Sequence, residues 1–213
     1  ISHEIRTTLK SIAAFSELIT DESLDAVTRE EFKDLILNNS TTLLSIVNNI
    51  LELSELVSSY EPLPVEPTDI YGLCVEEMEI LKEKILNSDI LCITEADKKE
   101  IIIPTNAFYL SRVIGNLLSN AAKFTEKGTI TLTCQIDEDQ EVVVISVTDT
   151  GIGIPTDKQE WVFERFTKVD DFKPGTGLGL YICRIIIQRR GGNIRIYTCY
   201  TKGCKVLVCM PIK

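Results

Sequence analysis

Residues 1–60 contain neither glycine nor proline, and this absence constrains the fold more than any other feature of the sequence. Both residue types interrupt helices, so a long stretch without them favours continuous helix. An apolar stripe at helical spacing runs through residues 5–19 and consists of Ile5, Leu9, Ile12 and Ile19. At about 100° per residue, this stripe lies on the side of the helix opposite His3. The sequence therefore predicts a helix that packs through the stripe and exposes His3.

A second helical pattern covers residues 28–56, where large apolar residues recur near heptad spacing. Thr28 followed by Glu31 matches a capping box and predicts the start of this helix, after a loop at residues 21–26. A lone helical hairpin cannot bury both apolar stripes, whereas dimerisation into a four-helix bundle would bury them. Periodicity alone also allows a helical spacer.

Three prolines fall within residues 61–67 and predict an extended linker. The rest of the chain, residues 68–213, mixes helical and strand periodicities. The expected helices cover residues 70–87, 107–124 (capped by Asn106) and 176–190, and the expected strands lie near 90–93, 101–103, 129–136, 141–148, 193–199 and 204–210. Such a mixture, ending in two hairpin-like strands, is typical of an α+β two-layer sandwich.

Charge and composition exclude several classes of function. The formal net charge of −10 argues against binding to nucleic acid or to an anionic membrane surface. No apolar window of about 18 residues is present, so no membrane contact is expected within this chain. The seven cysteines are odd in number and form no C-x-x-C pair, which favours buried free thiols in a reducing compartment. Because the chain starts with isoleucine, directly before the histidine motif, we expect it to be a piece of a longer protein.

Three polar residues of the helix expected at 107–124 indicate a phosphate-bearing ligand. Asn116 and Asn120 are four residues apart and share one helix face, and Lys123 lies close to that face. Amide oxygens can bind Mg²⁺, directly or through water, and lysine can bind a phosphate oxygen. Paired asparagines are also common as solvated residues, so this pattern alone is weak.

Asp149 ends an expected strand and is followed by Gly151 and Gly153. A carboxylate at this place could accept a hydrogen bond from an adenine amino group, while the glycines would let the backbone approach the ligand closely. The same pattern also occurs in ordinary turns.

A second glycine motif opens the helix expected at 176–190 and consists of Gly175, Thr176, Gly177, Leu178 and Gly179. Exposed N–H groups at a helix N-terminus favour phosphate. The motif matches neither a Walker loop nor a Rossmann fingerprint. The weakly periodic residues 154–175 between the two motifs predict a mobile lid, whose phenylalanines could equally belong to the core.

Together these motifs resemble those of the bacterial sensor histidine kinases, and the resemblance covers almost the whole chain. Residues 2–7 look like the H box, 116–123 the N box, 149–153 the G1 box, 163–166 the F box and 175–179 the G2 box. The resemblance implies a dimerisation and phosphoacceptor domain at 1–60, a linker at 61–67, and an ATP-binding domain of the gyrase, Hsp90 and MutL type at 68–213. It further implies a homodimer and a cytoplasmic location, within a membrane-anchored sensor.

The resemblance also implies autokinase chemistry in the H box. His3 would accept the γ-phosphoryl group of ATP, with Glu4 as the base that holds and deprotonates its ring. The phosphoryl group would then pass to an aspartate on the receiver domain of a response regulator. Thr7 would position a water for dephosphorylation of that regulator.

In the ATP-binding domain, Asn120 and Asn116 would bind Mg²⁺ according to the resemblance. The remaining contacts to ATP would come from Lys123 and Lys168 at the phosphates, from Phe124 and Asp149 at the adenine, and from the glycine motifs at residues 151–153 and 175–179. One departure from the family is Thr8, which stands where many relatives have proline and should straighten the helix after His3.

Two other functions remain open for such a chain. ATP hydrolases of the same fold carry a glutamate base four residues before the magnesium asparagine, and here that position is Asn116, which cannot take up a proton. A non-catalytic dimeric scaffold gated by nucleotide is the other alternative. The intact motifs favour the kinase.

Overall fold

The structure is a computed structural model that describes residues 2–58, 63–85, 89–170 and 175–213, with the side chains starting at residue 4. The chain forms two compact units. The first consists of Ile1–Ser58 together with Asp170–Thr176, and the second of Ser59–Val169 together with Gly177–Lys213.

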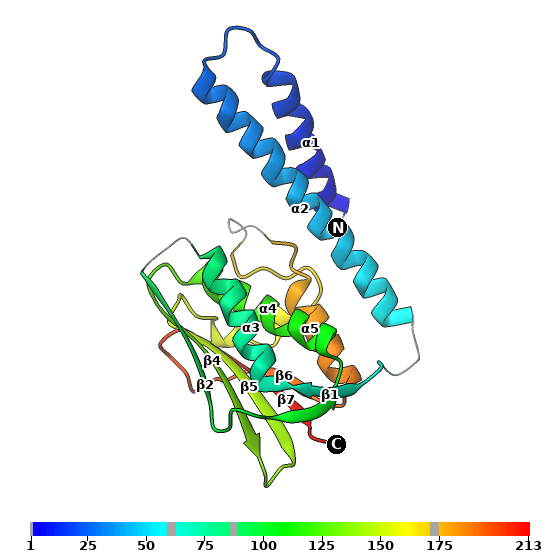
Figure 1. Cartoon of the computed structure of the whole chain (residues 1–213). Coiled ribbons are helices and arrows are strands. Elements are labelled where there is room, and N and C mark those ends of the chain that lie inside the picture. Colours follow the sequence, from blue (N-terminus) through cyan, green and yellow to red (C-terminus); the bar gives the residue numbers. More distant parts are fainter. Residues whose placement is uncertain (1, 59–62, 86–88, 171–174) are drawn as a thin grey trace. The chain divides into compact units, whose positions relative to one another are not determined.

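A helical hairpin makes up most of the first unit, with α1 (Ser2–Leu18) packed against α2 (Ala26–Ser58) (Figure 1). The rings of Phe15 and Phe32 pack across the hairpin, with their centroids 5.5 Å apart. Thr8 is buried in α1, and its hydroxyl donates to the Glu4 carbonyl oxygen at 3.0 Å. The predicted helical hairpin is therefore confirmed. The exposure predicted for His3 concerns a side chain that lies outside the described residues.

The start of α2 differs from the prediction. Asp25, rather than Thr28, caps the helix, because Asp25 Oδ1 accepts hydrogen bonds from the N–H groups of Val27 and Thr28 at 2.9 Å each. The Thr28 hydroxyl donates to Asp25 Oδ2 at 2.8 Å and so supports this cap instead of forming its own.

The hairpin leaves much of its apolar surface exposed within one chain. Ile46 and Leu56 of α2 are buried. Leu9, which was expected to pack inward, is 49% exposed because the contact with α2 does not cover the whole apolar stripe. The other exposed large apolar residues of the hairpin are Leu18, Val27, Leu35, Leu37, Leu44, Val47, Leu51 and Val57. As expected, one hairpin does not bury both stripes.

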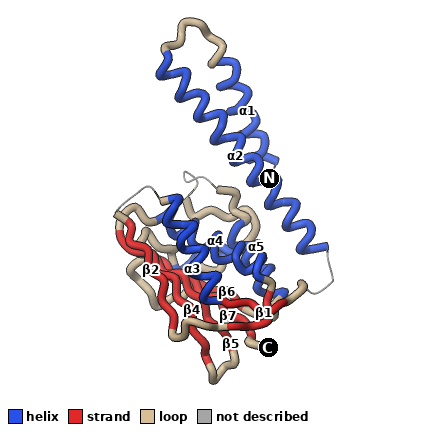
Figure 2. Tube along the Cα trace, in the orientation of Figure 1, coloured by secondary structure: helices blue, strands red, loops and turns tan. Residues whose placement is uncertain are grey.

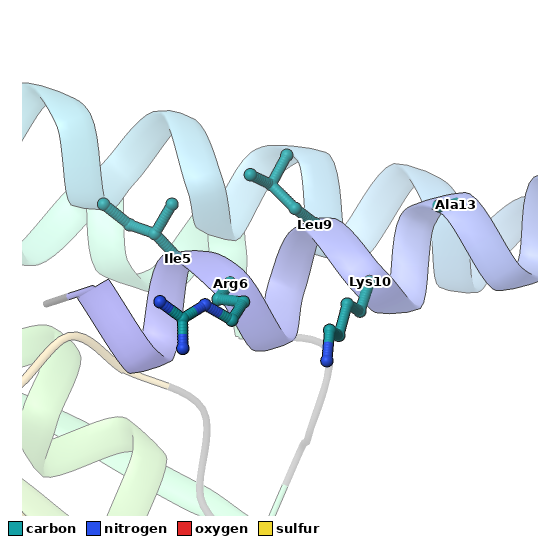
Figure 3. A pocket seen from close by; sticks show the side chains of 5 residues that line it. All are labelled: Ile5, Arg6, Leu9, Lys10 and Ala13. Atoms are coloured by element: carbon teal, nitrogen blue, oxygen red, sulfur yellow. The ribbon is translucent and has the colours of Figure 1, made fainter.

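An open hollow runs along α1 and is lined by Ile5, Arg6, Leu9, Lys10 and Ala13. Figure 3 shows Ile5 and Leu9 on one side of the helix and the charged groups of Arg6 and Lys10 on the other. The hollow thus combines apolar and basic side chains, and it begins two residues after His3 in the sequence.

A five-stranded sheet with strand order β2-β4-β5-β7-β6 forms one layer of the second unit (Figures 1 and 2). Its strands are β2 (Ile90–Ala96), β4 (Gly128–Asp137), β5 (Val142–Asp149), β6 (Asn193–Ile196) and β7 (Cys204–Pro211). The β2–β4 pair is parallel and the other pairs are antiparallel. A separate antiparallel pair joins β1 (Glu66–Asp69) to β3 (Ile102–Thr105).

Three helices form the second layer and lie on one face of the sheet, namely α3 (Ile70–Lys84), α4 (Ala107–Phe124) and α5 (Gly179–Arg189). Asn106 caps α4 as predicted, because its Oδ1 accepts from the Tyr109 N–H at 3.0 Å. The inner face of α4 is wholly apolar and buried, and it consists of Leu110, Val113, Ile114, Leu117, Leu118 and Ala121. The predicted two-layer sandwich is confirmed.

Three expected boundaries differ from those in the structure. The linker predicted at 61–67 falls partly outside the described residues, and its last two residues, Glu66 and Pro67, pair in β1. The helix expected from residue 176 begins at Gly179, so Gly177 and Leu178 precede it. The end of the helix expected at 70–87 also differs, because α3 ends at Lys84 and residues 86–88 lie outside the description.

The cysteines are free thiols, as predicted, and four of them are buried: Cys74, Cys134, Cys183 and Cys204. No helix within the described ranges combines the length and the apolar character needed to cross a membrane.

Candidate functional site

Asp149 ends β5 and is 6% exposed. Its Oδ1 accepts two backbone hydrogen bonds, from the Gly151 N–H at 2.9 Å and from the Cys204 N–H at 3.2 Å. Burial raises the pKa of this carboxyl above its ordinary value of 3.8, and the two hydrogen bonds partly oppose the rise. A buried carboxylate whose Oδ1 is fixed in this way can present its other oxygen to a ligand amino group.

The glycines beside Asp149 are required by close approaches of backbone to backbone. A Cβ on Gly151 would overlap the Phe124 carbonyl oxygen at the end of α4. Gly153 has φ +70°, and a Cβ there would lie 2.8 Å from the carbonyl oxygen of Gly203. Gly203 itself packs against the Asp149 carbonyl. The turn after β5 is thus held between α4 and the residues that lead into β7.

The polar face of α4 lies next to the start of α5. Asn116 Nδ2 donates to Cys183 Sγ at 3.2 Å, and a Cβ on Gly179 would lie 2.6 Å from both Nδ2 and Oδ1 of this amide. Because Nδ2 donates its hydrogen bond to the sulfur, this contact fixes the orientation of the amide, and Oδ1 is available to bind an ion. Asn120, one turn later on the same helix, is half-buried. The Lys123 ammonium lies over the Phe124 ring, 4.7 Å from its centroid.

The segment before α5 is hydrogen-bonded to Phe166. The Phe166 N–H donates to the Gly177 carbonyl oxygen at 2.8 Å, and both residues have positive φ, +64° and +65°. A Cβ on Gly177 would lie 2.7 Å from the Phe166 carbonyl carbon, so only glycine fits there. Leu178 is fully buried and anchors the segment.

The residues expected to form a lid contain two short 3₁₀ helices, η1 (Thr156–Lys158) and η2 (Trp161–Phe163). Phe163 is 1% exposed and belongs to the core, whereas Phe166 is 38% exposed. Arg184 of α5 stacks on the Phe163 ring at 4.6 Å and forms an ion pair with Glu160 at 2.8 Å. The stretch from Glu160 to Phe163 is therefore packed on α5, and residues 171–174 lie outside the description.

The remaining predicted site residues divide between the two units. Lys168 is half-buried in the second unit. Gly175 and Thr176 belong to the first unit, where Asn49 Nδ2 donates to Thr176 Oγ1 at 3.1 Å. In α1, Glu4 is half-buried and Thr7 is exposed. The structure thus brings together the predicted residues of α4, the turn after β5 and the start of α5.

Three residues near Asp149 and Asn116 were not predicted from the sequence: Thr125, Cys183 and Cys204. Cys183 supports Asn116, and Cys204 supports Asp149 through its N–H group. Burial and the nearby Asp149 charge raise the pKa of the Cys204 thiol to about 12. Apolar runs around both cysteines indicated burial, but no sequence pattern indicated what they contact.

Two family models match the chain. Residues 105–213 match the model described as histidine kinase-, DNA gyrase B-, and HSP90-like ATPase, and residues 1–58 match the His Kinase A (phospho-acceptor) domain. The first match covers the three site segments of the second unit, and the second covers His3.

Similar proteins and structures agree with these matches. The chain is 29% identical to the sensor histidine kinase WalK of Bacillus subtilis, covering 100% of the chain and 36% of WalK. It is 33% identical to hybrid signal transduction histidine kinase D of Dictyostelium discoideum, covering 100% of the chain and 14% of that protein. The chain thus spans a small part of the relatives it matches.

Solved structures show the same architecture. Histidine kinase ThkA in complex with the response regulator protein TrrA superposes with a TM-score of 0.82 at 26% identity, covering 100% of this chain and 60% of that one. Full-length ShkA in complex with AMPPNP gives a TM-score of 0.76 at 29% identity, covering 99% of this chain and 44% of that one. With both domains matched in order, the chain belongs to the histidine kinase-, DNA gyrase B- and HSP90-like ATPase family, and it joins a phosphoacceptor domain to an ATP-binding domain as two-component histidine kinases do.

Proposed function

We propose that this chain is an ATP-dependent autokinase that phosphorylates His3 and then passes the phosphoryl group to an aspartate of a response-regulator receiver domain. The main support for this proposal is that one chain contains both a phosphoacceptor domain and an ATP-binding domain. The phosphoacceptor domain contains the only histidine of the sequence, and the ATP-binding domain presents the buried Asp149 carboxylate, which the N–H groups of Gly151 and Cys204 hold in place. The AMPPNP and TrrA complexes of the related kinases ShkA and ThkA support the same reading.

The reaction at α1 needs an acceptor and a base. A ring nitrogen of His3 attacks the γ-phosphorus of ATP, a P–N bond forms, and the bond to the leaving ADP oxygen breaks. The other ring nitrogen loses its proton to the carboxylate of Glu4, the adjacent residue. Thr7, one turn later in α1, is exposed and would position a water that hydrolyses the phosphoryl group on the regulator aspartate and releases inorganic phosphate.

The residues of the second unit fit the parts of ATP. Asp149 would accept a hydrogen bond from the adenine amino group, beside the backbone of Gly151 and Gly153, and Phe124 would stack on the base. Lys123, Lys168 and the motif at 175–179 would bind the phosphates. Helix α5 begins at Gly179, and the N–H groups of its N-terminus would also bind phosphate.

The site also fits Mg²⁺, although no group of three His, Cys, Asp or Glu side chains within the described residues could hold a metal ion. Mg²⁺ accepts amide oxygens, water and substrate phosphates as ligands. Asn120 and Asn116 would supply the amide oxygens, and the hydrogen bond from Asn116 Nδ2 to Cys183 leaves Oδ1 for this purpose. Bound Mg²⁺ would neutralise charge on the transferred phosphoryl group.

Two partners follow from the surface of the hairpin. A second copy of the chain would cover the exposed leucines and valines of α1 and α2 in a four-helix bundle. The receiver domain of the regulator would dock near His3. The whole protein would be a membrane-anchored sensor, with this part in the cytoplasm.

One experiment separates the kinase from the two alternatives. Wild-type chain and His3→Gln are incubated with γ-labelled ATP and Mg²⁺, and both chain-bound label and released phosphate are measured. A kinase labels the wild-type chain in an acid-labile, alkali-stable form and leaves His3→Gln unlabelled. Phosphate release that persists in His3→Gln indicates a hydrolase, and nucleotide binding without either product indicates a scaffold.

A further inference from the structure

The Thr125 hydroxyl is a buried polar group without a partner. Thr125 follows α4, as its C-cap, and is 2% exposed. Of the side-chain oxygens and nitrogens buried within the described residues, Thr125 Oγ1 and Gln159 Oε1 have no hydrogen-bond partner. Native proteins rarely leave a buried hydroxyl unpaired, because it has lost its hydrogen bonds to water without gaining others. The Thr125 hydroxyl therefore requires an explanation.

The surroundings of Thr125 show where this hydroxyl points. Its Cγ2 methyl group lies 3.9 Å from the place of a Cβ on Gly128, and its Oγ1 lies 3.0 Å from the place of a Cβ on Gly151. The methyl group thus faces Gly128, and the hydroxyl faces the glycine turn. The N–H of that same Gly151 donates to Asp149 Oδ1. The hydroxyl and the carboxylate therefore both lie beside Gly151, which carries no side chain.

We propose that Thr125 Oγ1 is a further binding group for the base of the nucleotide, which it reaches directly or through one water. This inference rests on the proposed function, in which Asp149 binds the adenine amino group. A carboxylate only accepts hydrogen bonds, whereas a hydroxyl also donates. Adenine presents both an amino donor and ring-nitrogen acceptors, so Thr125 supplies the donor that Asp149 lacks.

The test uses Thr125→Val, which removes the hydroxyl and keeps the shape of the side chain, and Thr125→Ser, which keeps the hydroxyl. The matched control is Thr68→Val in β1. Thr68 is also buried, but its hydroxyl already has the carbonyl oxygens of Glu66 and Thr105 within 3.0 and 3.3 Å. Dissociation constants for ADP and ATP are measured by calorimetry, and the Tm is measured without nucleotide.

We expect Thr125→Val to weaken ADP and ATP binding by the same factor, about 5- to 10-fold, because both ligands share the base. Its Tm without nucleotide should not fall, since no hydrogen bond is lost. Thr125→Ser should bind within about twofold of wild type. Thr68→Val should show the opposite pattern, a lower Tm and unchanged binding.

Wild-type dissociation constants for Thr125→Val would overturn the inference, and so would weakening confined to ATP, which would place the hydroxyl at the phosphates. If Thr125→Val does not fold, Thr125→Ala compared with Thr125→Ser gives the same test. A wild-type chain that binds neither nucleotide would instead refute the proposed function itself.

Discussion

Replacing Asp149 by alanine and by asparagine should separate its structural role from its role in binding. In the Asp149→Ala variant, the buried Cys204 N–H and the partly buried Gly151 N–H both lose their hydrogen-bond acceptor. A buried N–H left unpaired costs about 1–3 kcal/mol, and one that water can reach costs less, so we expect Asp149→Ala to lose about 2–4 kcal/mol of stability. Asparagine keeps an Oδ1 acceptor and should lose less than about 1 kcal/mol.

The pH dependence of the free energy of unfolding gives a second, independent test of the role of Asp149. Because burial raises the pKa of Asp149 in the folded chain, the folded state binds more protons than the unfolded state at pH values just above 3.8. This contribution to stability is present at low pH and is lost as the pH rises through the raised pKa. Asparagine does not titrate, so the stability of Asp149→Asn relative to wild type should rise over the same interval.

Urea unfolding followed by the fluorescence of Trp161 measures both effects. Trp161 is the only tryptophan and lies in η2 of the second unit. Both variants should lose ATP affinity, because each lacks the carboxylate. Equal destabilisation of Asp149→Ala and Asp149→Asn at pH 7 would refute the reasoning, since it would mean that the two hydrogen bonds to Oδ1 contribute nothing.

Three further predictions concern residues around the site. Gly203→Ala should cost about 3 kcal/mol or more, because a Cβ there overlaps the Asp149 carbonyl. Gly191→Ala, also at positive φ, should cost about 1 kcal/mol, because its Cβ would make only an ordinary contact with Pro211 Cγ at 3.9 Å; urea unfolding compares the two variants. Cys183→Val removes the hydrogen-bond acceptor of the Asn116 amide and should weaken Mg²⁺-dependent ATP binding about 5- to 10-fold in calorimetry. Cys183→Ser should bind close to wild type, and equal weakening without Mg²⁺ would contradict this role of Cys183. Ellman's reagent at pH 8 should modify the exposed Cys199 rapidly. Cys204 should react only after unfolding, because burial raises the pKa of its thiol to about 12. Rapid reaction of both thiols would contradict the fold.

Much of the architecture could be predicted because its signals are local. The start of α4 depends on a cap at Asn106, whose side chain accepts a hydrogen bond from a residue only three positions later. The hairpin depends on a periodicity that no glycine or proline interrupts. The place of Asp149 at the end of β5 followed from an apolar strand that meets a glycine turn. The start of α2 was predicted wrongly from the Thr28 and Glu31 pattern, because the structure shows that Asp25 caps this helix.

The features that could not be predicted depend on contacts between distant residues. Helix α5 begins at Gly179 rather than at residue 176, and the Gly177 carbonyl before it accepts a hydrogen bond from Phe166, eleven positions earlier. The contact of Cys183 with Asn116 joins two helices, and that of Cys204 with Asp149 joins two strands. Burial of these cysteines was foreseeable from apolar runs, but their partners are set by the packing of the layers.

The central claim is that His3 receives the phosphoryl group of ATP, and mapping the phosphorylated site tests it most directly. Trypsin cleaves after Arg6 and releases residues 1–6, which contain the only histidine of the chain. After incubation with ATP and Mg²⁺, mass spectrometry should find the added phosphoryl group on this peptide, and mild acid should remove it. A phosphoryl group that is stable to acid, or that remains on the chain in His3→Gln, would contradict the account.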